Sequence, residues 1–153
     1  SDDMITKLGK NGGVIMINFG STFLSSEVSE YRKSLQAEIK TILDKKGLKA
    51  RDEAAEPIID EFFTKHPLAF ADVKKVADHI DNVVKLAGID HVGIGSDFDG
   101  VGNSLPTGLK DVSDYPNLIA ELLRRGYSES DIEKICSGNI FRVWEKVLAY
   151  AGN

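Results

Sequence analysis

The chain contains two short segments with the pattern of fully buried β-strands. Val14 to Phe19 is apolar without alternation, which is typical of a strand covered on both faces. His91 to Ser96 alternates small and apolar residues, as expected of a buried strand that passes close to other backbone. Two such strands cannot form a self-sufficient parallel sheet, because each needs paired neighbours and two covering layers. The sequence therefore predicts part of a larger α/β fold.

Amphipathic helical patterns fill most of the remaining chain. Helices are predicted between Ser25 or Ser26 and Gly47, from Ala50 to Lys65, between Asp72 and Gly88, from Pro116 to Gly126, and from Ser128 onward. Pro57 should either kink the second of these or mark its true start. Gly138-Asn139 is expected to break the chain into a last helix. The apolar stripe of that helix is predicted to face inward and consists of Ile140, Phe141, Trp144, Val147 and Leu148.

Composition bounds the class of protein. With 153 residues, 42% of them hydrophobic, residues 1–153 are interpreted as one partial domain. The net charge of −5 argues against a nucleic-acid surface. The longest near-continuous apolar run, Val14 to Ile17, is too short to span a membrane, and no signal-peptide pattern is seen, so no membrane anchor is expected in this chain. The lone Cys136 suits a reducing, cytoplasmic compartment and is predicted to be a buried structural thiol.

Two carboxylates and two glycines follow the second predicted strand. Asp97 and Asp99 come after Ser96, and Gly100 and Gly102 follow them. In α/β proteins the chemistry sits on loops that leave the C-terminal ends of parallel strands. Asp97 is therefore placed where a catalytic acid or base would lie, and the glycines would let a substrate approach the backbone. The structural alternative for Asp97 is a carboxylate that caps the amides of its own loop.

Other motifs in this stretch favour different functions more weakly. Gly93-Ile-Gly95 begins like a dinucleotide fingerprint, but Phe98 stands where the third glycine belongs. Asp97-Phe-Asp99-Gly100 begins like a calcium loop, but its glycine comes too early. A strand followed by Asp-x-Asp-Gly-Val also resembles the motif of haloacid-dehalogenase-type phosphatases, in which Asp97 would attack phosphorus and Asp99 would handle the leaving-group proton. Those enzymes need later strands, whereas helical patterns follow here, so the phosphatase stays an alternative.

The three histidines lack the spacing of a metal site. His66 precedes a proline at a helix end, His79 lies at the edge of a helical stripe, and His91 begins a strand. None forms a His-x-His or His-x-x-x-His pair, so we predict no metal ligand in this chain.

Several runs together resemble the membrane (renal) dipeptidase family, peptidase family M19, of the amidohydrolase superfamily. The most specific are Ser-Asp-Phe-Asp-Gly from Ser96 and Tyr-Pro-Asn-Leu from Tyr115. The likeness extends over nearly the whole chain and rests on residues 11–19, 76–81, 88–100 and 108–126, with Gly138-Asn139 and Arg142-Val143 similar to the family's closing helix.

The resemblance implies the C-terminal part of a (β/α)8 TIM barrel, with Val14–Phe19 as the seventh strand and Val92–Ser96 as the eighth. It also implies a zinc-dependent dipeptidase with two zinc ions, in which Asp97 passes a proton to the departing amine. The zinc ligands and the arginine for the substrate carboxylate would lie upstream of Ser1. The missing N-terminal half of the barrel is therefore the expected partner, and this chain alone is expected to be inactive.

The loops after both strands are expected to share one pocket. Because adjacent parallel strands open onto the same face, Asn18 to Phe23 should lie within reach of Asp97. Asn18, Phe19, Phe23 and Gly100 are accordingly predicted to contact a dipeptide substrate, with Phe19 or Phe23 as an apolar wall. We further expect a bacterial protein. Exposed strand edges leave open a homodimer, or a non-catalytic fragment that serves as an interaction module.

Overall fold

A computed structural model describes residues 1–152 and contains a two-stranded parallel sheet. Strands β1 (Ile15–Asn18) and β2 (Val92–Ser96) are slightly shorter than predicted. The register pairs Ile15 with Val92, Met16 with Gly93, Ile17 with Ile94 and, after a shift, Asn18 with Ser96. The close pairing requires a glycine at position 95, because a Cβ there would lie 2.9 Å from the backbone of Met16. The C-terminal ends of both strands lie at one edge, as predicted.

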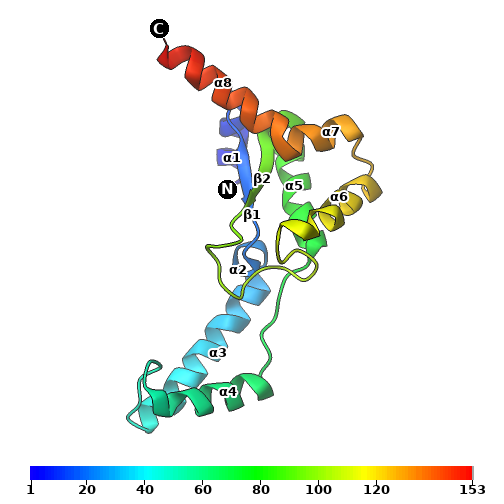
Figure 1. Ribbon diagram of the computed structural model, residues 1–153. Helices are drawn as coiled ribbons and strands as arrows, with labels where there is room; N and C mark the ends of the chain where they lie inside the picture. The colour runs from blue at the N-terminus through cyan, green and yellow to red at the C-terminus, as the bar shows by residue number, and fades with distance from the viewer. Residues whose placement is uncertain (153) are drawn as a thin grey trace.

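Helices cover one face of this sheet (Figure 1). Helix α5 (Val73–Ala87) packs against both strands, while α1 (Asp2–Lys10) and α6 (Tyr115–Arg124) pack against α5. The Asp72 carboxylate caps α5 by accepting a hydrogen bond from the Lys75 amide at 3.0 Å. The main hydrophobic core lies between these elements and includes Ile17, Val76, Ile80, Val92, Leu118 and Leu122. Each such aliphatic side chain contributes about 1.5–3 kcal/mol on burial.

The other face of the sheet is open around Met16 and Gly95 within the described chain. Met16 on β1 is 36% exposed, and Gly95 on β2 is also exposed. Parallel sheets are ordinarily covered on both faces. The two strands with their helices therefore form one covered side of an α/β architecture, as the sequence predicted.

A helical arm projects from the sheet and its covering helices (Figure 1). It consists of α3 (Ser26–Lys45) and α4 (Glu56–Lys65), joined through the 3-10 turn η1 (Glu53–Ala55), and it follows the short helix α2 (Ser21–Leu24). Pro57 lies in the first turn of α4 and marks its true start, since a proline there needs no amide hydrogen. The arm has its own apolar cluster, which includes Leu35, Ile39, Leu43 and Phe62.

The C-terminal helices tie together the segments that lead into the two strands. Helix α7 (Glu129–Glu133) continues through a π-helical turn, η4 (Lys134–Gly138), into α8 (Asn139–Ala151). The last helix begins at Asn139 as predicted, but the expected break is wrong, because Gly138 and Asn139 both have right-handed helical backbone. The buried Asn139 amide donates to the carbonyls of Ile89 and Val92 at 2.7 and 2.8 Å. The Arg142 guanidinium donates to the carbonyls of Gly12 and Asp90.

Two predictions about burial in this region are wrong. The stripe of α8 faces outward, with Phe141, Trp144, Val147 and Leu148 between 57% and 61% exposed. The helix extends past the sheet, so the other described residues leave this stripe uncovered (Figure 1). Cys136 is likewise exposed, because it lies on the outer side of η4 while its neighbour Ile135 is buried.

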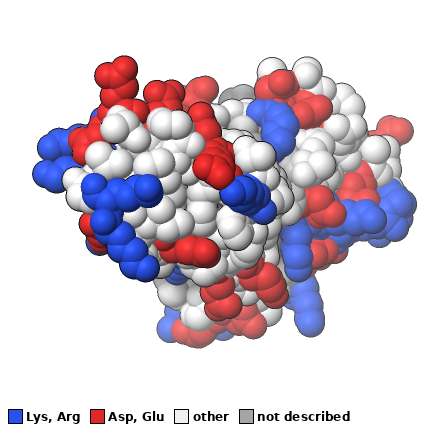
Figure 2. Space-filling view, turned by 90° about the horizontal axis from the view of Figure 1, so that it is seen from below, with Lys and Arg blue, Asp and Glu red and all other residues white. Residues whose placement is uncertain are grey.

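Surface charge is mixed in sign. Figure 2 shows acidic and basic side chains interspersed over the face seen from below, without a continuous basic field. Within residues 1–152, no helix combines the length and the apolar character needed to cross a bilayer.

The Asn139 contacts lead to a test of stability. We expect Asn139→Ala to lower the free energy of unfolding by about 2 kcal/mol, because the buried carbonyl of Val92 and the partly buried carbonyl of Ile89 lose their donor. Urea denaturation of the intact protein measures this loss. The control Asn82→Ala, at an exposed position on α5, should change stability by less than about 0.5 kcal/mol. Equal losses in the two variants would contradict the role given to Asn139.

Candidate functional site at the C-terminal ends of the strands

A hydrogen bond joins the ends of the two strands. Asn18, the last residue of β1, donates from Nδ2 to Oδ2 of the partly buried Asp97 at 2.6 Å. The other end of the same amide is also engaged, since Asn18 Oδ1 accepts from the Gly20 amide at 3.0 Å. This second bond fixes the orientation of the amide, so that its NH2 group points at the carboxylate. The predicted proximity of Asn18 to Asp97 is confirmed.

The backbone at the end of β2 adopts an uncommon conformation. Ser96 and Asp97 have φ values of 53° and 65°, in the left-handed region that costs non-glycine residues on the order of 1–3 kcal/mol each. Three contacts hold it there. The Phe19 amide donates to the Ser96 carbonyl at 3.0 Å, the Ser96 hydroxyl contacts the Tyr115 hydroxyl, and Asn18 holds the Asp97 carboxylate. Such strain persists where the surroundings over-determine it, and it is concentrated at functional sites.

Gly100 makes room for the second oxygen of the carboxylate. A Cβ at this position would lie 1.9 Å from Asp97 Oδ1, so any larger residue must displace the carboxylate. The Gly100 amide also closes the turn by donating to the backbone carbonyl of Asp97 at 3.2 Å. Asp99, in contrast, is exposed, and among the described residues its carboxylate accepts no hydrogen bond. Asp97 is thus the carboxylate that the fold holds in place.

The two predicted aromatic residues lie in different environments. Phe19 is fully buried and packs edge-on against Phe98 and Tyr115, with ring centroids 5.7 and 6.3 Å away. Because Phe19 has no exposed surface, its predicted contact with substrate is wrong, and it supports the site from beneath. Phe23 on α2 is 64% exposed, so it can form an apolar wall.

Tyr115 is a residue of the site that sequence reasoning missed. Its hydroxyl contacts Ser96 and its ring packs against Phe19 and Phe98. The Tyr-Pro pair at this position signals the start of a helix and is part of the family resemblance. Neither signal indicates that the phenol reaches back to the end of β2, since this depends on how α6 packs.

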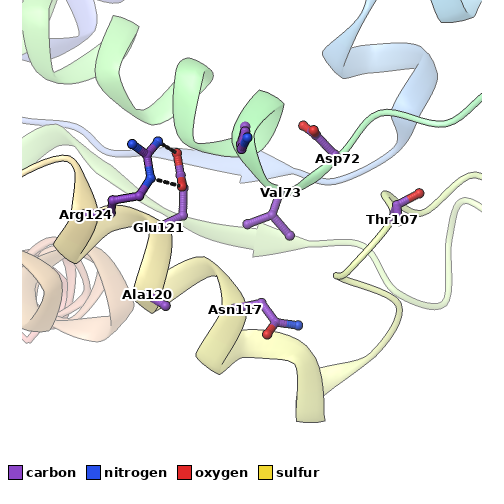
Figure 3. A pocket seen from close by; sticks show the side chains of 8 residues that line it. Asp72, Val73, Thr107, Asn117, Ala120, Glu121 and Arg124 are labelled. Atoms are coloured by element: carbon purple, nitrogen blue, oxygen red, sulfur yellow. Dashed lines mark hydrogen bonds and ion pairs between the residues drawn. The ribbon is translucent and has the colours of Figure 1, made fainter.

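A separate pocket lies between α5 and α6 (Figure 3). Figure 3 shows Glu121 and Arg124 paired at its wall, and Asp97 is not among its lining residues. Hydrogen bonds from Arg124 and Arg125 lower the pKa of Glu121 to about 2. Arg125 extends the network to Asp81 on α5. These charges tie two helices together, and an acid held so firmly ionised is unsuited to proton transfer near neutral pH.

The histidines have structural partners. The Nε2 atom of His79 lies 3.0 Å from the Leu24 carbonyl, and Nδ1 of His91 lies 2.7 Å from that of Gly13. His66 stacks on Phe62 with a centroid separation of 4.5 Å. Across residues 1–152, no group of three or more His, Cys, Asp or Glu side chains is placed to hold a metal. A metal centre therefore does not fit the described residues by themselves.

Known proteins match this chain in sequence and in fold. The family model described as membrane dipeptidase (peptidase family M19) matches residues 1–153. The probable dipeptidase PvdM from Pseudomonas aeruginosa is 32% identical and superposes with a TM-score of 0.65, over 94% of this chain and 39% of that one. A metallo peptidase from Rhodobacter sphaeroides, crystallised with a phosphinate mimic of the dipeptide L-Ala-D-Ala, is 24% identical, with a TM-score of 0.62 over 94% of this chain and 30% of that one.

The chain thus spans well under half of the length of these solved relatives. The match confirms the predicted fold class, a helix-rich α/β part of a (β/α)8 barrel. Agreement of the family model over the whole chain, together with the likeness to PvdM, identifies the chain as a member of the membrane dipeptidase family, peptidase family M19.

Proposed function

We propose that the protein containing this chain hydrolyses the peptide bond of small dipeptides with the help of bound metal. Family membership and the likeness to PvdM, described as a probable dipeptidase, support this activity. The dipeptide mimic bound by the Rhodobacter sphaeroides metallo peptidase supports the substrate class. The observation that carries the proposal is the Asp97 carboxylate, held by Asn18 at the C-terminal edge of the sheet.

Asp97 is proposed to transfer the proton. One of its oxygens is engaged by Asn18, and the other lies beside Gly100, where no side chain crowds it. A carboxylate so placed can accept a proton from the attacking water as the oxygen bonds to the carbonyl carbon. It can then give that proton to the amine nitrogen as the C–N bond breaks, so that the carboxylate is regenerated.

The metal would have to be held by residues outside this chain. Zinc, with two ions, remains our proposal for the intact protein, and it would supply an activated water. Because the described residues offer no ligand set, we expect residues 1–153 alone to be inactive. The open face of the sheet around Met16 and the apolar stripe of α8 are the surfaces that the rest of the barrel would cover.

Substrate contacts are proposed for the exposed residues around Asp97. Phe23 offers apolar surface on α2, and Gly100 leaves backbone accessible beside the carboxylate. Asn18 donates a hydrogen bond to Asp97, and any contact of Asn18 with the substrate would be additional to that bond. The phosphatase alternative loses support, because the chain belongs to family M19 and no strand follows β2 within residues 1–152.

The first test of this function removes the charge of Asp97. In the intact, metal-loaded protein, Asp97→Asn should lower kcat by roughly 100-fold or more, the usual scale for losing a general acid–base group. Metal content, measured by elemental analysis, should not change. Asp99→Asn is the matched control and should retain most of the turnover. If Asp99→Asn abolished turnover with the fold intact while Asp97→Asn did not, the assignment would be reversed.

The second test moves the carboxylate without changing its chemistry. Gly100→Ala should displace Asp97 Oδ1, since the new methyl group would overlap it. We expect kcat to fall by about 10-fold to 100-fold, the cost of misplacing a catalytic group by about 1 Å. Gly138→Ala is the control, because the nearest atom to a Cβ there lies at 3.6 Å. Unchanged kinetics in Gly100→Ala would contradict the proposed position of the carboxylate during turnover.

A further inference from the structure

Three consecutive carbonyls in the loop that follows Asp97 are each held by a different part of the chain. The Asn103 carbonyl accepts from Arg32 Nη1 on α3 at 3.0 Å. The Ser104 carbonyl accepts from the Ser21 amide at the start of α2 at 2.7 Å. The Leu105 carbonyl accepts from Lys110 Nζ at 2.5 Å. A loop without regular structure is thereby fastened at its midpoint.

Phe70 brings the two cations together. The guanidinium carbon of Arg32 lies 4.7 Å from the centre of the Phe70 ring, and the ammonium nitrogen of Lys110 lies 4.1 Å from it. Both distances are those of cation–π contacts. Arg32 also donates from Nε and Nη2 to the Ala69 carbonyl at 3.1 and 2.9 Å, so the segment before α5 is held by the same guanidinium.

The side chains of Arg32 and Lys110 donate hydrogen bonds to backbone carbonyls, and neither donates to a carboxylate. Among the described residues neither Arg32 nor Lys110 forms an ion pair. Burial lowers the pKa of both side chains, and the nearby charge of Arg32 lowers that of Lys110 further. Arg32 is partly buried, whereas Lys110 is exposed, and the charge of the Asp114 carboxylate opposes the lowering of the Lys110 pKa. The hydrogen bonds to Asn103 and Leu105, made by two cations that share the Phe70 ring, point to a role in holding the loop.

We infer that Arg32, Lys110 and Phe70 form a clamp that positions Asp97 by holding the middle of its loop. The loop begins at the strained backbone of Ser96 and Asp97, which Asn18 and Tyr115 hold at one end. The clamp holds the loop six to eight residues later, at Asn103 to Leu105. The segment between Asp97 and Asn103 is therefore fixed at both of its ends. The turn within it, which the Gly100 amide closes, has little freedom to relax. Arg32 and Lys110 are positioning residues, since they act through the loop.

Amide hydrogen exchange on the intact protein tests the clamp directly. Lys110→Met keeps the apolar stem on Phe70 and removes the donor to Leu105, while Arg32→Gln removes the donor to Asn103. Both should speed exchange by about 10-fold or more in two regions, because local opening becomes easier. The first is the pair of amides of Ser21 and Ser104, which donate to the carbonyls of Ser104 and Gly102, and the second is the Gly100 amide, which donates to the Asp97 carbonyl. Lys33→Gln, an exposed neighbour on α3, is the matched control and should leave both regions unchanged.

Measurements of kcat and KM then distinguish a positioning role from a purely stabilising one. This second experiment rests on the proposed dipeptidase function. Both clamp variants should lower kcat by about 10-fold, with KM within about twofold, because the reacting group is misplaced while the substrate contacts remain. Unchanged exchange at the Gly100 amide would overturn the clamp, as would faster exchange with normal kcat. Wild-type protein without dipeptidase activity would refute the proposed function instead, and the Gly100 exchange would still decide the clamp. If Arg32→Gln failed to fold, Lys110→Met alone would carry the test.

Discussion

The parallel pairing of β1 with β2 is the constraint on which the rest of this structure depends. It joins segments 79 residues apart, so that Asn18 at the end of one strand meets Asp97 beyond the end of the other. The pairing is close because Gly95 has no side chain to push against the backbone of Met16. The strained backbone of Ser96 and the turn at Gly100 both follow directly from this edge of the sheet.

Much of this arrangement could be predicted from local patterns. The two buried strands, the caps of the longer helices and the meeting of Asn18 with Asp97 follow from hydrophobic runs and from the rule that parallel strands end at one edge. Burial in α8 could not be predicted, because a stripe such as Phe141 and Trp144 shows that a helix has an apolar face but not what covers it. Phe19 was misplaced because nearness to the end of a strand does not show which way a ring points; it lies two residues after Ile17 and joins the same core.

The long-range contacts of the site lie beyond such patterns. Tyr115 and Arg32 reach the loop of Asp97 from helices whose packing depends on the whole fold. Their sequence neighbourhoods show a helix start and an amphipathic helix, with nothing to mark a tie to a distant carbonyl. A side chain that acts by hydrogen bonding to distant backbone has no sequence motif of its own. Such contacts are seen only in the three-dimensional structure. A short motif thus identifies Asp97, but it does not reveal Tyr115 and Arg32, which hold the surrounding backbone.

The most direct test of the central claim is a crystal structure of the intact, metal-loaded protein with a phosphinate dipeptide mimic, the kind of ligand bound by the Rhodobacter sphaeroides relative. Our account predicts an Asp97 carboxylate oxygen within roughly 3 Å of a phosphinate oxygen, the reach needed for proton transfer. The bond from Asn18 to the other oxygen should remain. A mimic bound with Asp97 turned away, outside hydrogen-bond reach, would contradict the account.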